Sequence, residues 1–165
     1  MKKMPVYFLF SLIGFILMGT DSPAGFTIPK DAYRIYELDN ALQNAKEDNW
    51  ALAFLLASEK TTCPLGTKAS LNAIRELEEQ CIIVYVDAFD NELTKCPNIV
   101  LRAFQSQKAG RTLPIVVITD PKCKRIVDII PYANSEEAYL ELLREANNKI
   151  TESPSLMERI VNMFQ

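Results

Sequence analysis

Two cysteines occupy positions where a thiol could react. Cys63 follows the apolar run Trp50–Ala57 and a polar stretch, and Pro64 comes directly after it; Cys96 is followed by Pro97 in the same way. Proline is favoured at the first position of a helix, so each cysteine is predicted to be the N-cap of a helix. The amides at a helix N-terminus stabilise a thiolate, which is the reactive form of cysteine. We therefore predict Cys63 as a nucleophile that forms mixed disulfides, with Cys96 as the candidate resolving thiol.

The second cysteine of a dithiol motif is missing. Three residues after Cys63 the chain has Gly66, and a single thiol that forms a mixed disulfide needs another thiol to resolve it. Cys96 is expected on the same edge of the sheet as Cys63. A bridge between them is either a non-adjacent redox pair or a permanent structural link, and the sequence leaves both open. Cys63 itself is either reactive or part of such a structural disulfide.

The other two cysteines are expected to have different roles. Cys81 begins an apolar strand, where it is predicted to be a small buried side chain. Cys123 lies in a predicted turn as an exposed thiol or one that links two copies of the chain. A bridge between them would have to cross an intervening strand. Four cysteines allow three complete pairings, and their spacing does not choose among them.

Composition excludes several classes of function. The chain has 165 residues, a net charge of −3 and no histidine, so catalysis by a serine–histidine or cysteine–histidine pair is excluded. No CxxC motif is present, so the cysteines do not have zinc or iron–sulfur spacing, and we predict no metal and no cofactor. No basic run is present, which argues against a nucleic-acid partner.

The N-terminus is typical of a secretory signal. Lys2 and Lys3 precede the apolar stretch Val6–Met18, and small residues follow as far as Ala24. This stretch is shorter than the ~20 residues of a membrane span, so we predict a signal peptide at 1–24 and no stable span after its cleavage. The protein is expected to be periplasmic or secreted, in a compartment where disulfides persist, with thiols or disulfides of exported proteins as partners.

Hydrophobic periodicity predicts alternating strands and helices between residues 33 and 150. Strands are predicted at 33–36, 50–57, 81–86, 115–119 and 125–130, and helices at 38–48, 64–79, 97–109 and 135–150. Asp39, Asn49 and Asn134 are predicted to cap helices. Residues 151–165 are predicted to be a C-terminal tail with a short amphipathic helix, through which a homodimer could form.

The order of these elements predicts an α/β fold. A helix between strands 50–57 and 81–86 makes them parallel, because such crossovers are right-handed. Residues 115–130 are predicted to be a hairpin, which adds antiparallel strands and gives a mixed sheet with helices on both faces.

This arrangement resembles the thioredoxin-like superfamily over roughly residues 33–150, and most of all its secreted members. The resemblance rests on the cysteine that caps a helix after the first buried strand and on the segment Pro114-Ile-Val-Val-Ile-Thr-Asp120-Pro121. It implies a three-layer α/β/α sandwich in which Pro114 is a cis-proline beside the active site. Thr112, Leu113 and Pro114 would then bind an extended substrate.

The chain departs from the family pattern Trp-Cys-x-x-Cys, because it reads Thr62-Cys63-Pro64-Leu65-Gly66. Two functions therefore remain open. One is thiol–disulfide exchange at Cys63. The other is a redox-inactive module that binds an extended polypeptide or a protein partner.

Overall fold

A computed structural model describes residues 27–152. The predicted signal peptide and most of the predicted C-terminal tail, including its amphipathic helix, lie outside the described residues. The strands are β1 (Tyr33–Arg34), β2 (Ala51–Ala57), β3 (Cys81–Asp87), β4 (Ile115–Thr119) and β5 (Ile126–Ile130). The α-helices are α1 (Leu38–Asp48), α2 (Pro64–Leu77), α3 (Asn98–Phe104) and α4 (Glu136–Thr151), with 3-10 turns η1 (Ile35–Glu37), η2 (Asn91–Lys95) and η3 (Gln107–Ala109).

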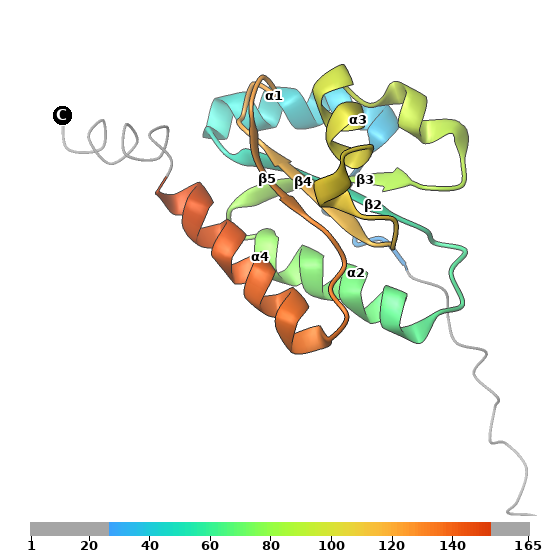
Figure 1. Ribbon diagram of the computed structural model, residues 1–165. Helices are drawn as coiled ribbons and strands as arrows, with labels where there is room; N and C mark the ends of the chain where they lie inside the picture. Colours follow the sequence, from blue (N-terminus) through green and yellow to red (C-terminus); the bar gives the residue numbers. More distant parts are fainter. Residues whose placement is uncertain (1–26, 153–165) are drawn as a thin grey trace, which may run out of the picture.

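The strands form one mixed sheet in the order β1-β3-β2-β4-β5. Strands β2 and β3 run parallel, β4 runs antiparallel to β2, and β5 runs antiparallel to β4. Helices α2 and α4 cover one face of the sheet, and α1 and α3 cover the other (Figure 1). The predicted α/β sandwich, with a mixed central sheet between two layers of helices, is confirmed.

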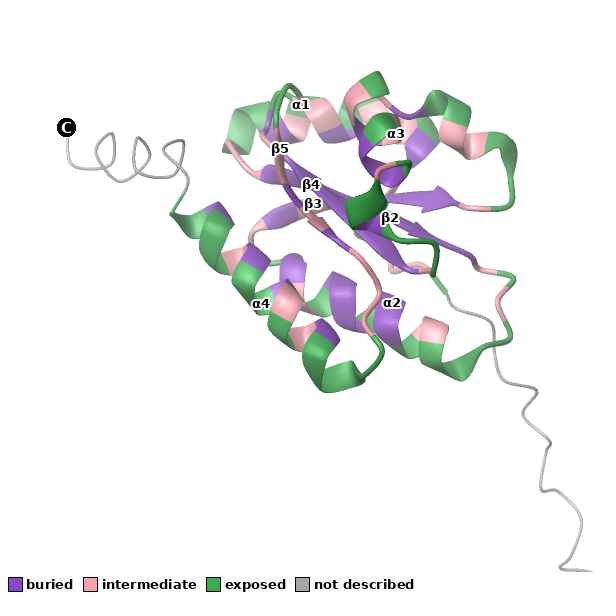
Figure 2. Cartoon of the chain, viewed as in Figure 1, coloured by how far each residue is buried: buried purple, intermediate pink, exposed green. Residues whose placement is uncertain are grey.

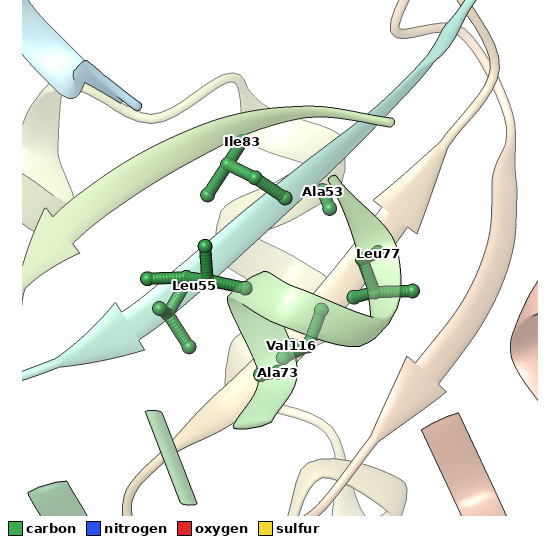
Figure 3. A pocket seen from close by; sticks show the side chains of 7 residues that line it. Ala53, Leu55, Ala73, Leu77, Ile83 and Val116 are labelled. Atoms are coloured by element: carbon green, nitrogen blue, oxygen red, sulfur yellow. The ribbon is translucent and has the colours of Figure 1, made fainter. Parts of the chain in front are cut away.

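The central strand β2 is buried along its whole length because helices cover both faces (Figure 2). This explains its continuous apolar sequence, since only a strand with one solvated face needs to alternate. On one side, Figure 3 shows side chains of α2 directed at β2, β3 and β4. The residues in this contact include Ala73 and Leu77 of α2, Ala53 and Leu55 of β2, Ile83 of β3 and Val116 of β4.

Two helix ends follow local sequence rules. Asn49, which was predicted to end a helix, follows the last residue of α1 and has the left-handed conformation, with φ 51°. This conformation is common where a helix ends. Pro64 is the first residue of α2 and Cys63 is its N-cap, with the extended backbone of that position. Both predictions are confirmed.

Three predicted caps differ in the structure. Helix α4 is capped by Ser135, whose hydroxyl accepts a hydrogen bond from the amide of Ala138, so Asn134 lies one residue too early. The amide of Cys96 donates to the carbonyl of Leu93 and closes η2, so that Pro97 becomes the N-cap of α3. Helix α1 begins at Leu38, which places Asp39 inside its first turn.

The hydroxyl oxygen of Tyr139 in α4 is buried without a hydrogen-bond partner among the described residues. Its side chain is 1% exposed. An unsatisfied buried hydroxyl is costly, so Tyr139→Phe is expected to raise the free energy of unfolding by about 1 kcal/mol. Urea denaturation measures this change.

Tyr85 of β3 provides the matched control. Its ring is also buried, but its hydroxyl accepts a hydrogen bond of 2.9 Å from the amide of Glu59. Tyr85→Phe is therefore expected to lower the free energy of unfolding by about 1 kcal/mol. A loss of stability in both variants would contradict the explanation given for Tyr139.

Candidate functional site

Cys63 lies at the start of α2, on the edge of the sheet where β2 ends. Its amide donates to the hydroxyl of Thr61 at 3.2 Å, and its carbonyl accepts from the amide of Thr67 at 3.1 Å. Its side chain is exposed and makes no capping hydrogen bond. The backbone of Cys63 is thus held on both sides, while the thiol remains open to solvent.

The loop before Cys63 is anchored to two strands. Arg34 of β1 binds both carboxylate oxygens of Glu59, at 2.8 and 3.0 Å, and the hydrogen bond to Glu59 raises the pKa of Arg34. The amide of Glu59 donates to the hydroxyl of Tyr85 in β3. Lys60 also pairs with Asp90, which lies in the loop after β3, at 3.1 Å. These contacts determine where the loop delivers Cys63.

The predicted substrate-binding residues lie directly before β4. The Leu113–Pro114 peptide bond is cis. Pro114 is buried, Leu113 is half-buried and Thr112 is exposed, so the segment emerges from the core towards solvent.

The strand register places this segment on the same edge as Cys63. Leu56 of β2 pairs with Ile115 of β4, and the two strands are antiparallel, so Pro114 comes opposite the end of β2. Cys63 follows that same end of β2 after a short loop. The structure therefore brings Cys63 and Pro114 to one edge of the sheet, as the topology predicts.

Gly66 marks the position of the absent second thiol. A Cβ atom built on Gly66 would lie 3.9 Å from the Cβ of Cys63 and 3.8 Å from the hydroxyl of Thr61, which is ordinary contact. Disulfides join Cβ atoms that are about 3.5–4.5 Å apart. The Cβ separation between positions 63 and 66 therefore lies within the disulfide range, although only one thiol is present.

Cys96 has different surroundings from Cys63. It is 7% exposed and belongs to the apolar layer between the sheet and helices α1 and α3. Burial, and then the nearby charges of Glu92 and Cys123, raise the pKa of Cys96 to about 12. All four cysteines are free thiols in the structure.

Cys81 lies on the opposite face of the sheet, in the layer formed by α2 and α4. It is 2% exposed, and burial raises its pKa to about 12. The prediction that Cys81 is a small buried side chain is confirmed. Cys123 is half-buried in the β4–β5 turn.

Two large apolar side chains that follow β2 and β3 at this edge of the sheet were not predicted to be exposed. Leu65 is 66% exposed and Phe89 is 73% exposed. Helical periodicity places Leu65 on the buried face of α2, which is wrong because the first turn of this helix extends beyond the core. The only signal for Phe89 is a single aromatic residue in the otherwise polar loop after β3.

Asp87 organises the loop that carries Phe89. It is the last residue of β3 and is 3% exposed, and its carboxylate accepts hydrogen bonds from the amides of Phe89 and Asp90 at 2.8 and 3.4 Å. This carboxylate is occupied with backbone groups, which gives it a structural role.

The described part of the chain contains no group of three or more acidic or cysteine side chains placed to hold a metal ion. Within residues 27–152, none of the helices has the length and apolar character needed to cross a membrane.

Comparison with known proteins finds no family model and no curated protein that matches this chain. One similar solved structure is described as "DsbH Oxidoreductase". It shares 16% sequence identity with this chain at a TM-score of 0.46, over 82% of this chain and 95% of that one.

Proposed function

We propose that this chain is an exported thioredoxin-fold protein that exchanges thiols and disulfides through the single thiol of Cys63. The observation that carries the proposal is the exposed, uncapped side chain of Cys63 at the N-terminus of α2. The amides at the start of a helix favour the thiolate, which is the attacking species. The proposed route of export is the signal peptide predicted at 1–24.

The reaction takes place in two exchanges. The thiolate of Cys63 attacks one sulfur of a substrate disulfide, so that a bond forms between these two sulfurs while the original disulfide bond breaks. The other substrate sulfur leaves as a thiolate and takes a proton from water. A second thiolate then attacks the substrate sulfur of the mixed disulfide. A new disulfide forms between these two sulfurs while the bond to Cys63 breaks, and Cys63 leaves as its thiolate.

We propose that the second thiol comes from outside the chain. The sequence offers Cys96 for this step, but its burial and its pKa of about 12 leave very little thiolate near neutral pH. A small thiol in solution can reach the exposed Cys63 directly.

We further propose a disulfide-containing polypeptide in an extended conformation as the substrate. Thr112 and Leu113 lead from solvent to the buried Pro114 on the edge that carries Cys63. Leu65 follows Cys63 by two residues and is available to contact apolar side chains of such a substrate.

The test is turnover of a fluorescent disulfide-linked peptide with glutathione as the second thiol. The wild-type rate is expected to rise with glutathione concentration, and Cys63→Ser is expected to reduce it to the uncatalysed background. Cys123→Asn is the matched control and should retain the wild-type rate. A wild-type protein no faster than background, or an active Cys63→Ser variant, would overturn the proposal.

A redox-inactive binding module is the second candidate, and the observation that favours it is Gly66 at the place of a second cysteine. In that case Cys63→Ser leaves the binding of a polypeptide partner intact. The turnover assay distinguishes the two functions, because a binding module does not accelerate exchange.

A further inference from the structure

Cys123 has a backbone conformation that disfavours its side chain. Its φ is 52°, in the left-handed region, and its amide donates to the carbonyl of Asp120 at 2.9 Å within the β4–β5 turn. Glycine and asparagine adopt this conformation at lower cost than a residue with an ordinary Cβ. A cysteine at this point suggests a role for its thiol, since backbone outliers gather at functional positions.

Helix α3, which follows Cys96, packs against β5, which follows Cys123. Asn98 and Ile99, in the first turn of α3, line one groove together with Ile126, the first residue of β5. Cys96 comes two residues before Asn98, and Cys123 comes three residues before Ile126. Cys96 and Cys123 therefore directly precede the two segments, α3 and β5, that line this groove.

The two thiols also share one layer of the molecule. Cys96 belongs to the apolar cluster between the sheet and helices α1 and α3, and Cys123 packs against that cluster. Burial is the largest cause of the raised pKa of Cys96, followed by the charges of Glu92 and of Cys123. The two thiols are therefore close enough to interact electrostatically. Cys81 is on the opposite face, and Cys63 follows the far end of β2.

We propose that Cys96 and Cys123 form a disulfide in an oxidising compartment, which links the β4–β5 turn to the start of α3. The two thiols give up two protons and two electrons to a small disulfide. One sulfur–sulfur bond forms between Cys96 and Cys123, and the bond of the small disulfide is reduced to two thiols. This inference does not depend on the chemistry proposed for Cys63.

The bridge is expected to be a lasting link. Burial raises the pKa of both Cys96 and Cys123, so each sulfur is a poor leaving group when another thiol attacks the bridge. The bridge closes a loop between residues 27 positions apart, which restricts the unfolded chain. It also leaves Cys63 as the accessible thiol.

The experiment oxidises the full chain with oxidised glutathione at pH 8.5 and maps its peptides by mass spectrometry without reduction. We expect a peptide pair joined through Cys96 and Cys123 in the wild type and in Cys63→Ser. Oxidation should raise the melting temperature of both proteins by roughly 10 °C. In Cys123→Asn, whose new residue suits the left-handed turn, the pair and the shift should both be absent.

Two outcomes would overturn the proposal. One is a bridge between Cys63 and Cys96. The other is recovery of Cys96 and Cys123 as separate thiols or separate glutathione adducts after oxidation. If Cys63→Ser loses exchange activity but retains the Cys96–Cys123 peptide pair, both proposals are supported independently. If the wild type lacks exchange activity but forms the pair, only the function proposed for Cys63 fails.

Discussion

Gly66→Cys is expected to convert the protein into a dithiol oxidoreductase that releases its substrate from Cys63 without an external thiol. An external reductant is then needed only to reduce the disulfide that the new thiol forms with Cys63. The position already allows a side chain, because a Cβ there lies 3.9 Å from the Cβ of Cys63 and meets nothing closer than 3.8 Å. That separation falls within the roughly 3.5–4.5 Å of natural disulfides. The new thiol would resolve the mixed disulfide at Cys63 faster than a thiol that must diffuse to it.

Insulin reduction and a redox titration would measure the effect of Gly66→Cys. Cys63 and the introduced thiol should titrate as a two-electron couple with a potential of roughly −270 to −120 mV, the range of dithiol proteins with this spacing. Gly66→Ser is the matched control, because it adds a side chain of similar size without a thiol, and it should behave as the wild type does. A Gly66→Cys protein that forms no internal disulfide at this site would show that the first turn of α2 does not hold the dithiol geometry.

Removing the two lysines that bind Asp128 is expected to destabilise the protein more than removing Asp128 itself. The carboxylate of Asp128 on β5 is only 7% exposed and binds Lys108 at 2.5 Å and Lys149 at 2.6 Å. The side chains of Lys108 and Lys149 are 58% and 49% exposed. Water can therefore solvate the lysines when they lose their partner, but it cannot reach the buried carboxylate in the same way.

Comparing a variant without the two lysines with a variant without the Asp128 charge separates the cost of an unpaired buried charge from the loss of the ion pairs. Lys108→Met with Lys149→Met leaves the buried carboxylate without a positive partner and with the amide of Ile129, at 2.8 Å, as a remaining donor. We expect a loss of about 3–5 kcal/mol in the free energy of unfolding. Asp128→Asn removes the charge and retains the size of the side chain, with an expected loss of about 1–2 kcal/mol. Urea denaturation at pH 7 measures both. Equal losses in the two variants would show that Asp128 does not depend on these lysines.

The same cluster predicts a dependence of stability on pH. Burial alone would raise the pKa of Asp128, but hydrogen bonds from Lys108 and Lys149 outweigh it and hold the pKa below its ordinary value. A carboxylate with a lowered pKa contributes its stability above the unfolded pKa of about 3.9, and this contribution is lost as the pH falls through the folded pKa. Below about pH 4 the free energy of unfolding of the wild type should fall as Asp128 becomes protonated. Asp128→Asn has no carboxylate at this position, so its stability should not show this part of the pH dependence.

Local sequence was sufficient for most of the fold. Proline at position 64 sets the start of α2 and so makes Cys63 an N-cap, because its ring fits the first helical turn. The apolar run that ends at Ala57 specifies a strand buried on both faces. The alternation of strands and helices then leaves few topologies, since parallel crossovers are right-handed.

Boundaries that depend on competing hydrogen bonds were less predictable. Asn134 and Ser135 are both acceptable caps by residue type, and only the backbone path decides that the hydroxyl of Ser135 meets the amide of Ala138. Cys96 similarly closes the turn η2, a structure for which the polar sequence 88–95 carries no periodic signal.

The sequence by itself determined the α/β class, the sheet edge that carries Cys63 and the absence of a second thiol at Gly66. Each of these follows from residues that are close together in the chain. Only the tertiary structure decided which face of the sheet each remaining cysteine occupies, that Leu65 is exposed, and that Asp128 is held between two lysines. These features depend on the packing of segments distant in sequence, and hydrophobic periodicity specifies which residues of a segment are apolar but not which other segment covers them.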